Sequence, residues 1–477
     1  MWCMSPPPIT SEQLAGLPPE FRALLESVID HYESRISALL ARVAELEARL
    51  GKTPQNSSLP PSSQHLHAKP VVKKGKSKKR RGGQPGHPKH ERPLIPSEDC
   101  DEVQELKPTE CRRCSERLRG SDPEPLRHQV WELPEIQPHV TEYQRHRLVC
   151  LGCGETTCGE LPVGVSTSTA GPRLVALVAL LMGCYRQSKR RTALFLEQIF
   201  GQPCSTGWVV KLQNQATAAT RGAYDELAAT LPAEPVVGMD ETPTKEANGK
   251  AWLWTAAAGK FTVFAVRPSR EGTAVSEWLG DEFAGVVICD RAKMYWQVER
   301  LQWCWAHLKR DFQALIDSGN AQAQRLGYDL RCGARRLFEH WANYRDGTIS
   351  RAALLRRLGP VRRRIEQLLL RGARSGNRLF QGTCRELHEH RGRLWAFLRH
   401  EGVEPTNNAS ERALRHAVIW RKLSFGTQSA AGSRFVETML TVIETCRQQS
   451  RNVFAYLTDA LEAHFAGQTV PSLLPRA

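Results

Sequence analysis

The stretch from residue 234 to residue 290 constrains the fold most, because its apolar residues recur in short runs typical of β-strands. It opens with EPVVGMDE, and KAWLWTAAAGKFTVFAVRPS follows with two strand-like runs around a tight turn at Gly259. A helical stretch, REGTAVSEWLGDEF, then leads to GVVICD, a strand that is apolar through Cys289. A strand entered through a helix normally lies parallel to an earlier strand by a right-handed crossover. We therefore expect the fourth strand to pair in parallel with the first.

This order of elements, a three-stranded meander followed by a helix and a parallel strand, is that of an RNase H-like domain. Asp240 is expected to close the first strand and Asp290 to close the fourth. If those two strands are neighbours, their ends meet and both carboxylates face one cleft. Paired like charges need a cation, and carboxylate oxygens with retained water are what Mg²⁺ prefers. The two acids predict a Mg²⁺ or Mn²⁺ site for phosphoryl chemistry, although each alone also fits a turn residue at a strand end.

The heptapeptide TNNASER, residues 406 to 412, has two interpretations. In the first, Asn408 caps a helix through its side-chain oxygen, and Glu411 at the third helical position reaches back to the cap residue. In the second, Glu411 is a third acid that a later helix brings to Asp240 and Asp290. Arg415 lies one turn beyond Glu411 on the same face, and together with Lys422 it either contacts phosphates or is ordinary surface charge.

A chain of 477 residues is too long for one ordinary core, so several domains are expected. The predicted fold class is a multidomain α/β protein with an all-helical insertion in its α/β core. The expected segments are an N-terminal coiled coil (1–51), a basic Pro/Gly-rich linker (52–98), a zinc ribbon (99–165), a helix-turn-helix-like region (166–232), the first part of the core (233–316), an Arg-rich helical insertion (317–403) and C-terminal core helices (404–477).

The net charge of +16 is concentrated in two zones. Residues 69–92 hold ten Lys or Arg and one acid, and residues 309–404 hold twenty Lys or Arg and ten acids. Two separate basic zones favour a polyanionic partner, most simply nucleic acid. A solubilising tail combined with salt-bridged helices is the alternative.

Two C-x-x-C pairs, Cys111 with Cys114 and Cys150 with Cys153, predict a tetrahedral Zn²⁺ site of four thiolates. Strand-like runs between the pairs, HQVWEL and HVTEYQRHRLV, suggest a ribbon with an elongated hairpin. Four cysteines in a core without metal are the alternative. The start, MWCMSPPP, lacks the features of a secretion signal, and the longest apolar run, residues 174–185, is too short to cross a membrane. We therefore expect thiols and metal ligands rather than disulfides.

Two helical segments suggest assembly and DNA binding. A heptad pattern over residues 20–50 predicts a parallel coiled-coil dimer or one amphipathic helix packed on its own domain. The first apolar position of the heptad holds Ile29, Ile36, Val43 and Leu50, and the second holds Leu25, Tyr32, Leu39 and Leu46. Residues 191–215 show two helices around Gly201, with Ser205 as a possible cap. This outline fits a helix-turn-helix as well as an ordinary helical hairpin, and its candidate base-reading side chains are Lys211, Gln213 and Asn214.

Several short motifs occur together: NSSLPPSS, GGQPGHPKH, the paired C-x-x-C, MDETP, CDRAKMYW, CWAHLKRDF and EPTNNASERALR followed by WRKLSFGTQS. With them the chain resembles transposases of the insertion-sequence-66 family, which are DDE enzymes, over nearly its whole length. The resemblance implies a catalytic triad of Asp240, Asp290 and Glu411. In place of the family's SDGY-like stretch, this chain has Arg291 beside the second acid.

The resemblance also singles out Cys304 and His307 in CWAH, a C-x-x-H signature found in several such transposases. The pair is either half of a metal site whose second half is not evident in the sequence, or a packed cysteine with a hydrogen-bonded histidine near the active site.

The function that the resemblance implies is transposition of DNA. A bacterial cytoplasmic, nucleoid-associated enzyme would cut at insertion-sequence ends and transfer a 3′-OH into target DNA, as a homodimer or higher oligomer and with accessory proteins of the same element. Two other functions remain open from the residues: a domesticated or inactive zinc-dependent DNA-binding regulator, and a nuclease or resolvase that only cuts.

Overall fold

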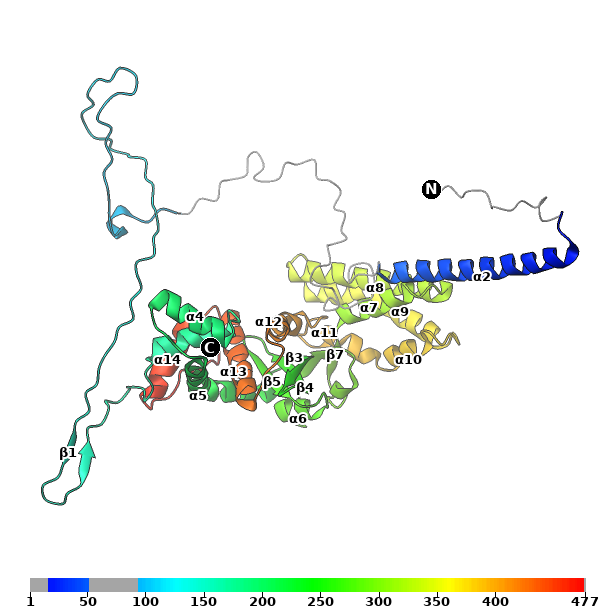
Figure 1. The fold of residues 1–477 in the computed structure, drawn as a ribbon. Helices are drawn as coiled ribbons and strands as arrows, with labels where there is room; N and C mark the ends of the chain where they lie inside the picture. The colour runs from blue at the N-terminus through cyan, green and yellow to red at the C-terminus, as the bar shows by residue number, and fades with distance from the viewer. Residues whose placement is uncertain (1–15, 51–92, 476–477) are drawn as a thin grey trace. The chain divides into compact units, whose positions relative to one another are not determined.

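The computed structural model describes residues 16–50 and 93–475 (Figure 1). The predicted basic linker, and with it the first basic zone, lies outside the described residues up to position 92. The described chain divides into two compact units, one holding residues 16–50, 221–452 and 472–475, the other residues 93–220 and 453–471. Across these ranges, none of the helices combines the length and apolar character that a membrane crossing requires.

The N-terminal segment is one continuous helix, α2 (Pro19–Leu50). Tyr32, Ile36, Leu39 and Val43 along it are at least half exposed. Exposed apolar side chains at heptad spacing are what a second helix of a coiled coil covers, so pairing through α2 stays a prediction.

In the second unit, α3 is the buried apolar helix that the sequence predicts, and it contacts α14. The helix-turn-helix outline is present as two helices joined at Gly201, whose φ of 62° ends α4. Ser205 caps α5 as expected, because its Oγ accepts from the Trp208 N–H at 3.1 Å. Gln213 is buried, so of the three candidate base-reading residues only Lys211 and Asn214 are exposed. The helices and strands of this part of the chain are β1 (Arg147–Val149), β2 (Thr156–Cys158), α3 (Pro172–Gly183), α4 (Lys189–Phe200), α5 (Thr206–Thr230) and α14 (Val453–Phe465).

The core of the other unit is a five-stranded sheet with the order β5-β4-β3-β6-β7. The strands and the crossover helix are β3 (Val236–Glu246), β4 (Gly249–Ala257), β5 (Thr262–Arg267), α6 (Thr273–Leu279), β6 (Val286–Cys289) and β7 (Leu301–Trp303). The first three strands form an antiparallel meander, and β6 lies parallel to β3. The predicted parallel pairing of the fourth strand with the first is therefore confirmed. The sequence did not indicate β7, which is only three residues long and lies parallel to β6.

The prediction that Asp240 closes the first strand is wrong, because β3 continues to Glu246. The extra residues pair with β4 as far as Glu246 opposite Gly249. Ala247 and Asn248 close this hairpin with φ values of 48° and 65°. Two consecutive positive φ values give a turn whose twist matches that of paired strands. The hairpin of β3 and β4 can therefore continue beyond the apolar residues of EPVVGMDE.

The remaining chain of this unit is helical, including the Arg-rich residues 317–403. Its helices are α7 (Trp305–Ile316), α8 (Ala321–Arg345), α9 (Arg351–Ala373), α10 (Gln381–Glu389), α11 (Ala396–Arg399), α12 (Asn408–Ser424) and α13 (Ala430–Gln448).

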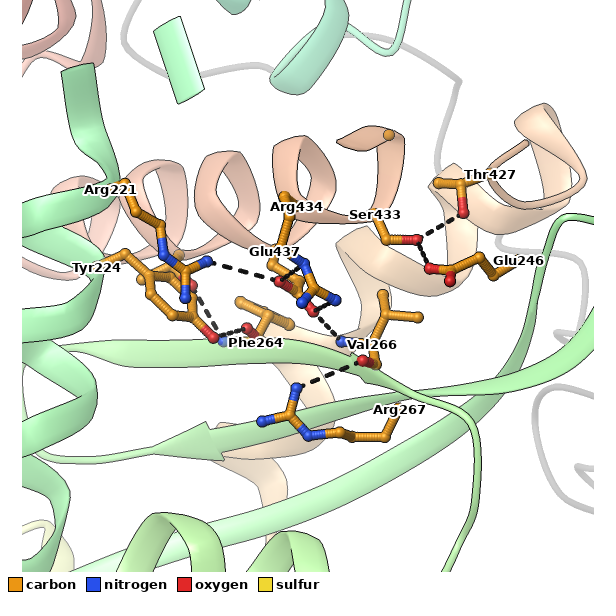
Figure 2. Close-up of polar contacts among 12 residues, drawn as sticks. Arg221, Tyr224, Glu246, Phe264, Val266, Arg267, Thr427, Ser433, Arg434 and Glu437 are labelled. Carbon is orange, nitrogen blue, oxygen red and sulfur yellow. Dashed lines mark hydrogen bonds and ion pairs between the residues drawn. The ribbon is translucent and has the colours of Figure 1, made fainter. Parts of the chain in front are cut away.

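Helix α13 satisfies the hydrogen-bond donors on the outer edge of the sheet with side chains spaced four residues apart, of which Figure 2 shows Glu437 beside Val266. The backbone N–H groups of Val266, Phe264 and Thr262 on β5 donate to Glu437, Thr441 and Thr445, at 2.6, 3.0 and 3.2 Å. Glu437 is 1% exposed and also pairs with Arg434 at 2.8 Å and Arg221 at 3.7 Å. An open edge strand can pair with other chains, and α13 removes that possibility here.

Replacing Thr441 with valine is expected to lower the free energy of unfolding by about 1–3 kcal/mol, because the buried Phe264 N–H loses its acceptor. Thr438→Val is the matched control, since the Thr438 hydroxyl is buried on the same helix and has no hydrogen-bond partner among the described residues. Chemical denaturation followed by circular dichroism measures both. Equal midpoints for the two variants would show that the side chains of α13 do not stabilise the edge.

Candidate active site

The structure brings Asp240 and Asp290 side by side. On the parallel strands β3 and β6, Gly238 lies opposite Ile288. Each aspartate is two residues further along its own chain, so the same register places Asp240 beside Asp290, with about 4.8 Å between neighbouring strands. Asp290 follows directly after β6, where its Oδ1 accepts the Ala292 N–H at 2.8 Å. The sequence-based expectation that the two acids share one edge of the sheet therefore agrees with the structure.

Helix α12 approaches β3 closely enough to add Glu411 to this pair. A Cβ atom on Gly238 would collide with Ser410 Oγ and lie 2.8 Å from Asn407 Oδ1. The Asn407 side chain donates from Nδ2 to the carbonyl of Met239 at 2.7 Å. Glycine at position 238 and asparagine at 407 thus position the first turn of α12, and with it Glu411, against the strand that carries Asp240.

The capping interpretation of TNNASER is wrong in its details. Helix α12 begins at Asn408, and the residue before it, Asn407, is the cap residue and makes no side-chain cap bond. The Glu411 N–H donates to the Asn407 carbonyl at 3.0 Å, which makes Glu411 the fourth helical residue rather than the third. The Asn407 side chain instead donates to the Met239 carbonyl of β3, a contact that the capping argument missed.

The electrostatics of the site show that the three acids interact. Burial, followed by the carboxylates of Glu241, Glu411 and Asp290, raises the pKa of Asp240 well above its usual range. Burial also raises the pKa of Glu411, an effect that the guanidinium of Arg310 opposes. Three carboxylates at one place repel one another, and a bound divalent cation relieves this repulsion.

A fourth acid, Glu241, lies next to Asp240 and was not singled out from the sequence. Its side chain is 2% exposed and pairs with Arg270 at 2.6 Å. The hydroxyl of the buried Tyr295 also donates to it. Glu241 is therefore compensated by protein groups, and its oxygens are occupied by Arg270 and Tyr295.

The C-x-x-H pair meets Glu411 at the N-terminus of α7. Cys304 Sγ lies 3.8 Å from Glu411 Oε1, and His307 Nδ1 lies 3.5 Å from the same oxygen. Among the described residues, these three side chains are the one group of three or more His, Cys, Asp or Glu whose candidate ligand atoms all lie within 4.8 Å of one another. The sequence did not reveal this third group, because Glu411 lies more than a hundred positions away in the chain.

The basic residues near the acids differ in their roles. Arg415 and Lys422 are both exposed on α12. Arg291, in contrast, is held between Asp311 at 3.0 Å and Glu386 at 2.7 Å. The departure from the family pattern at Arg291 therefore links the loop after Asp290 to helices α7 and α10.

Both C-x-x-C pairs form the same turn. In the first pair, the Cys111 N–H donates to Glu116 O at 2.8 Å, and the Ser115 N–H donates to Cys111 O at 2.9 Å. The second pair repeats both bonds with Cys150, Glu155 and Gly154, at 2.8 Å each. Backbone N–H groups of each turn point at the first sulfur and lower the pKa of both Cys111 and Cys150. Each turn suits metal binding, because metals bind the thiolate form.

The two turns do not meet in this structure. No three of the four sulfur atoms, all of which lie in described residues, come within 4.8 Å of one another. The expected elongated hairpin is also absent from HQVWEL, and the strands of residues 93–165 are limited to β1 and β2. Because Leu126, Val130 and Leu133 are almost fully exposed, this segment has no apolar core that would bring the two turns together.

Comparisons with known proteins place the chain in a family. The family model described as "Transposase IS66 family" matches residues 167–434, which is more than half of the chain and includes all three acids. The chain therefore belongs to the IS66 family of transposases. A second model, described as "Family of unknown function (DUF6444)", matches residues 6–93.

One relative carries a similar sequence. It is "Uncharacterized protein y4qI" of Sinorhizobium fredii (strain NBRC 101917 / NGR234), which is 26% identical over 236 residues. The match covers 44% of this chain and 43% of that protein, so the chain spans less than half the length of this relative.

Gly238→Ala is expected to displace the first turn of α12 and to lower the free energy of unfolding by about 1–3 kcal/mol through overpacking. Ser410→Ala in the same chain should recover part of the loss, because it removes the colliding Oγ, which has no hydrogen-bond partner in the described structure. Gly259→Ala is the control, since a Cβ there meets nothing within 4 Å. Thermal unfolding compares the variants, and a Gly238→Ala protein as stable as Gly259→Ala would contradict the close approach.

Proposed function

We propose that this protein is a DNA transposase that cleaves strands at the ends of its insertion sequence and joins the freed 3′-OH to target DNA. The observation that carries the proposal is the convergence of Asp240, Asp290 and Glu411 from β3, the end of β6 and α12 in a chain of the IS66 family. The strand order β5-β4-β3-β6-β7, with a parallel pair beside an antiparallel meander, supports an RNase H-like catalytic core.

The donor set suits Mg²⁺ or Mn²⁺. All three proposed ligands offer carboxylate oxygens, which hard divalent ions prefer. The repulsion between Asp240 and the neighbouring carboxylates favours a bound cation. Asp240, Asp290 and Glu411 would hold such ions, which would supply activation of a water or 3′-OH and stabilisation of the leaving oxygen of an in-line displacement. The chain's own contribution is positioning: the register of β3 and β6 fixes the two aspartates, and the Asn407 tether fixes Glu411. Arg270 keeps Glu241 paired, so Glu241 is not part of the proposed ligand set.

Two groups of basic side chains support double-stranded DNA as the substrate. Arg412, Arg415 and Lys422 are exposed on α12, at spacings that follow one face of the helix from Glu411 onward. A hollow of about 790 Å³ on α7 and α8 is lined by Lys309, Arg331 and Arg335 together with aromatic rings. Arg415 acts on the charge of Glu411, and basic side chains of this kind can neutralise the phosphates of bound DNA.

Assembly and additional metal binding complete the proposal. Pairing of two chains through the exposed heptad of α2 suits an enzyme that joins two DNA ends, and accessory proteins of the same element are further proposed partners. We also propose that Zn²⁺ draws the two cysteine turns together into one four-thiolate site, because metal binding supplies the free energy that orders such small segments.

Asp240→Asn is expected to reduce strand cleavage and strand transfer by at least about a hundredfold, because loss of a metal ligand removes several kcal/mol of transition-state stabilisation. The assay uses duplexes carrying the element's ends, Mg²⁺ and the full chain. Asp281→Asn, at an exposed acid of the same unit, is the control and should react like the natural protein.

The same assay separates the alternatives. Strand transfer that survives Asp240→Asn would refute the assignment of the acids. Cleavage without joining would identify a nuclease or resolvase, and DNA binding with neither reaction would identify a regulator.

Cys150→Ser is expected to lower bound zinc by about one equivalent per chain, since three remaining thiolates bind the ion much less tightly. Cys332→Ser is the matched control, because Cys332 is an exposed cysteine in α8 and outside the paired turns. Metal analysis of the purified full chain measures the difference. Equal zinc content in the two variants would refute the ribbon.

A further inference from the structure

The cluster of Cys304, His307 and Glu411 is built differently from the proposed carboxylate site. It offers a thiol, an imidazole and one carboxylate oxygen, a donor set that suits Zn²⁺ and other borderline metals rather than Mg²⁺. The three groups come from the start of α7 and the first turn of α12.

The separations among these atoms are those of ligands around one ion. With Zn–S of about 2.3 Å and Zn–N or Zn–O of about 2.0–2.2 Å, a tetrahedron has S–O edges of about 3.6 Å and N–O edges of about 3.4 Å. The observed separations from Glu411 Oε1 are 3.8 Å to Cys304 Sγ and 3.5 Å to His307 Nδ1. The first separation also fits a hydrogen bond from the Cys304 thiol, whereas the second is longer than an ordinary N–H···O hydrogen bond of 2.7–3.2 Å. Hydrogen bonding therefore accounts for one of the two contacts, and a shared ion accounts for both.

Each ligand atom is presented for coordination. Cys304 is the cap residue of α7, which places its Sγ beside Glu411 of α12. Its Sγ accepts the Asn407 N–H at 3.2 Å, an outer contact that orients the sulfur. His307 Nδ1 is buried and has no hydrogen-bond partner in the described structure.

We propose that Cys304, His307 and Glu411 form a three-ligand site for Zn²⁺, with the fourth position left to water. The site is separate from the paired cysteines. It shares only Glu411 with the proposed catalytic metals, and the zinc ligand is Oε1, so the second carboxylate oxygen takes no part in it. Zinc at this position is a clamp that fixes the orientation of the Glu411 carboxylate. The binding claim depends on these three side chains and holds whether or not the chain transposes DNA.

The test uses the full chain with Cys111, Cys114, Cys150 and Cys153 all changed to serine, so that the paired turns cannot contribute metal. Titration with Co²⁺, which replaces Zn²⁺ and reports thiolate ligation by a charge-transfer band in the near ultraviolet, should show one equivalent bound with that band. Adding Cys304→Ser should abolish the band, and adding His307→Ala should weaken binding by at least about tenfold. Adding Cys332→Ser, at an exposed cysteine of α8, should change neither.

A second measurement needs no change at Cys304. X-ray absorption at the zinc edge of the same four-serine protein should show one sulfur at about 2.3 Å together with nitrogen or oxygen neighbours. Less than about a tenth of an equivalent of metal, or a spectrum without sulfur, would overturn the proposal. Strand transfer with Mg²⁺ is measured separately on the natural chain, so failure of the zinc site and failure of the proposed function are distinguishable.

Discussion

The contact between α12 and β3 at Gly238 is the constraint on which the candidate site depends. Backbone and side-chain atoms of two segments about 170 residues apart meet there without a Cβ between them, and the Asn407 amide fastens the helix to the Met239 carbonyl. Because Glu411 lies one turn into α12 and Asp240 lies two residues beyond Gly238, this one contact fixes the third acid relative to the first. The register between β3 and β6 fixes the second.

Burial at this contact gives the four neighbouring acids different environments. Glu241 has an arginine and a tyrosine hydroxyl as partners, so its charge is neutralised within the protein. Asp240 is more deeply buried, and its carboxylate accepts the Glu241 N–H at 3.0 Å. A carboxylate held among other carboxylates in this way favours a bound cation. The arrangement therefore separates an acid that stabilises the fold from the acids proposed to hold metal.

Local patterns in the sequence predicted those parts of the structure that depend on neighbouring residues. Apolar runs gave the meander, the crossover helix and the parallel strand, and the acids at Asp240 and Asp290 followed from that order. The same reasoning failed where a contact spans the chain. Asn408 satisfied the rules for a cap, but the Met239 carbonyl engages Asn407 instead, and no local pattern encodes that partner. The glutamate that completes the Cys304 and His307 cluster was hidden for the same reason.

The long helical segment between α7 and α12 can be accommodated because it leaves and rejoins the core at one point. The Trp305 N–H at the start of α7 donates to Pro405 O at 2.9 Å, just before α12 begins. Near the end of the segment, the buried Gln302 of β7 accepts the Phe397 N–H at 2.8 Å and donates to Leu394 O at 3.2 Å. These hydrogen bonds hold together the two ends of a segment of about a hundred residues. Both ends of the Arg-rich helical segment therefore stay fixed on the core, and the same closure holds Cys304 beside Glu411.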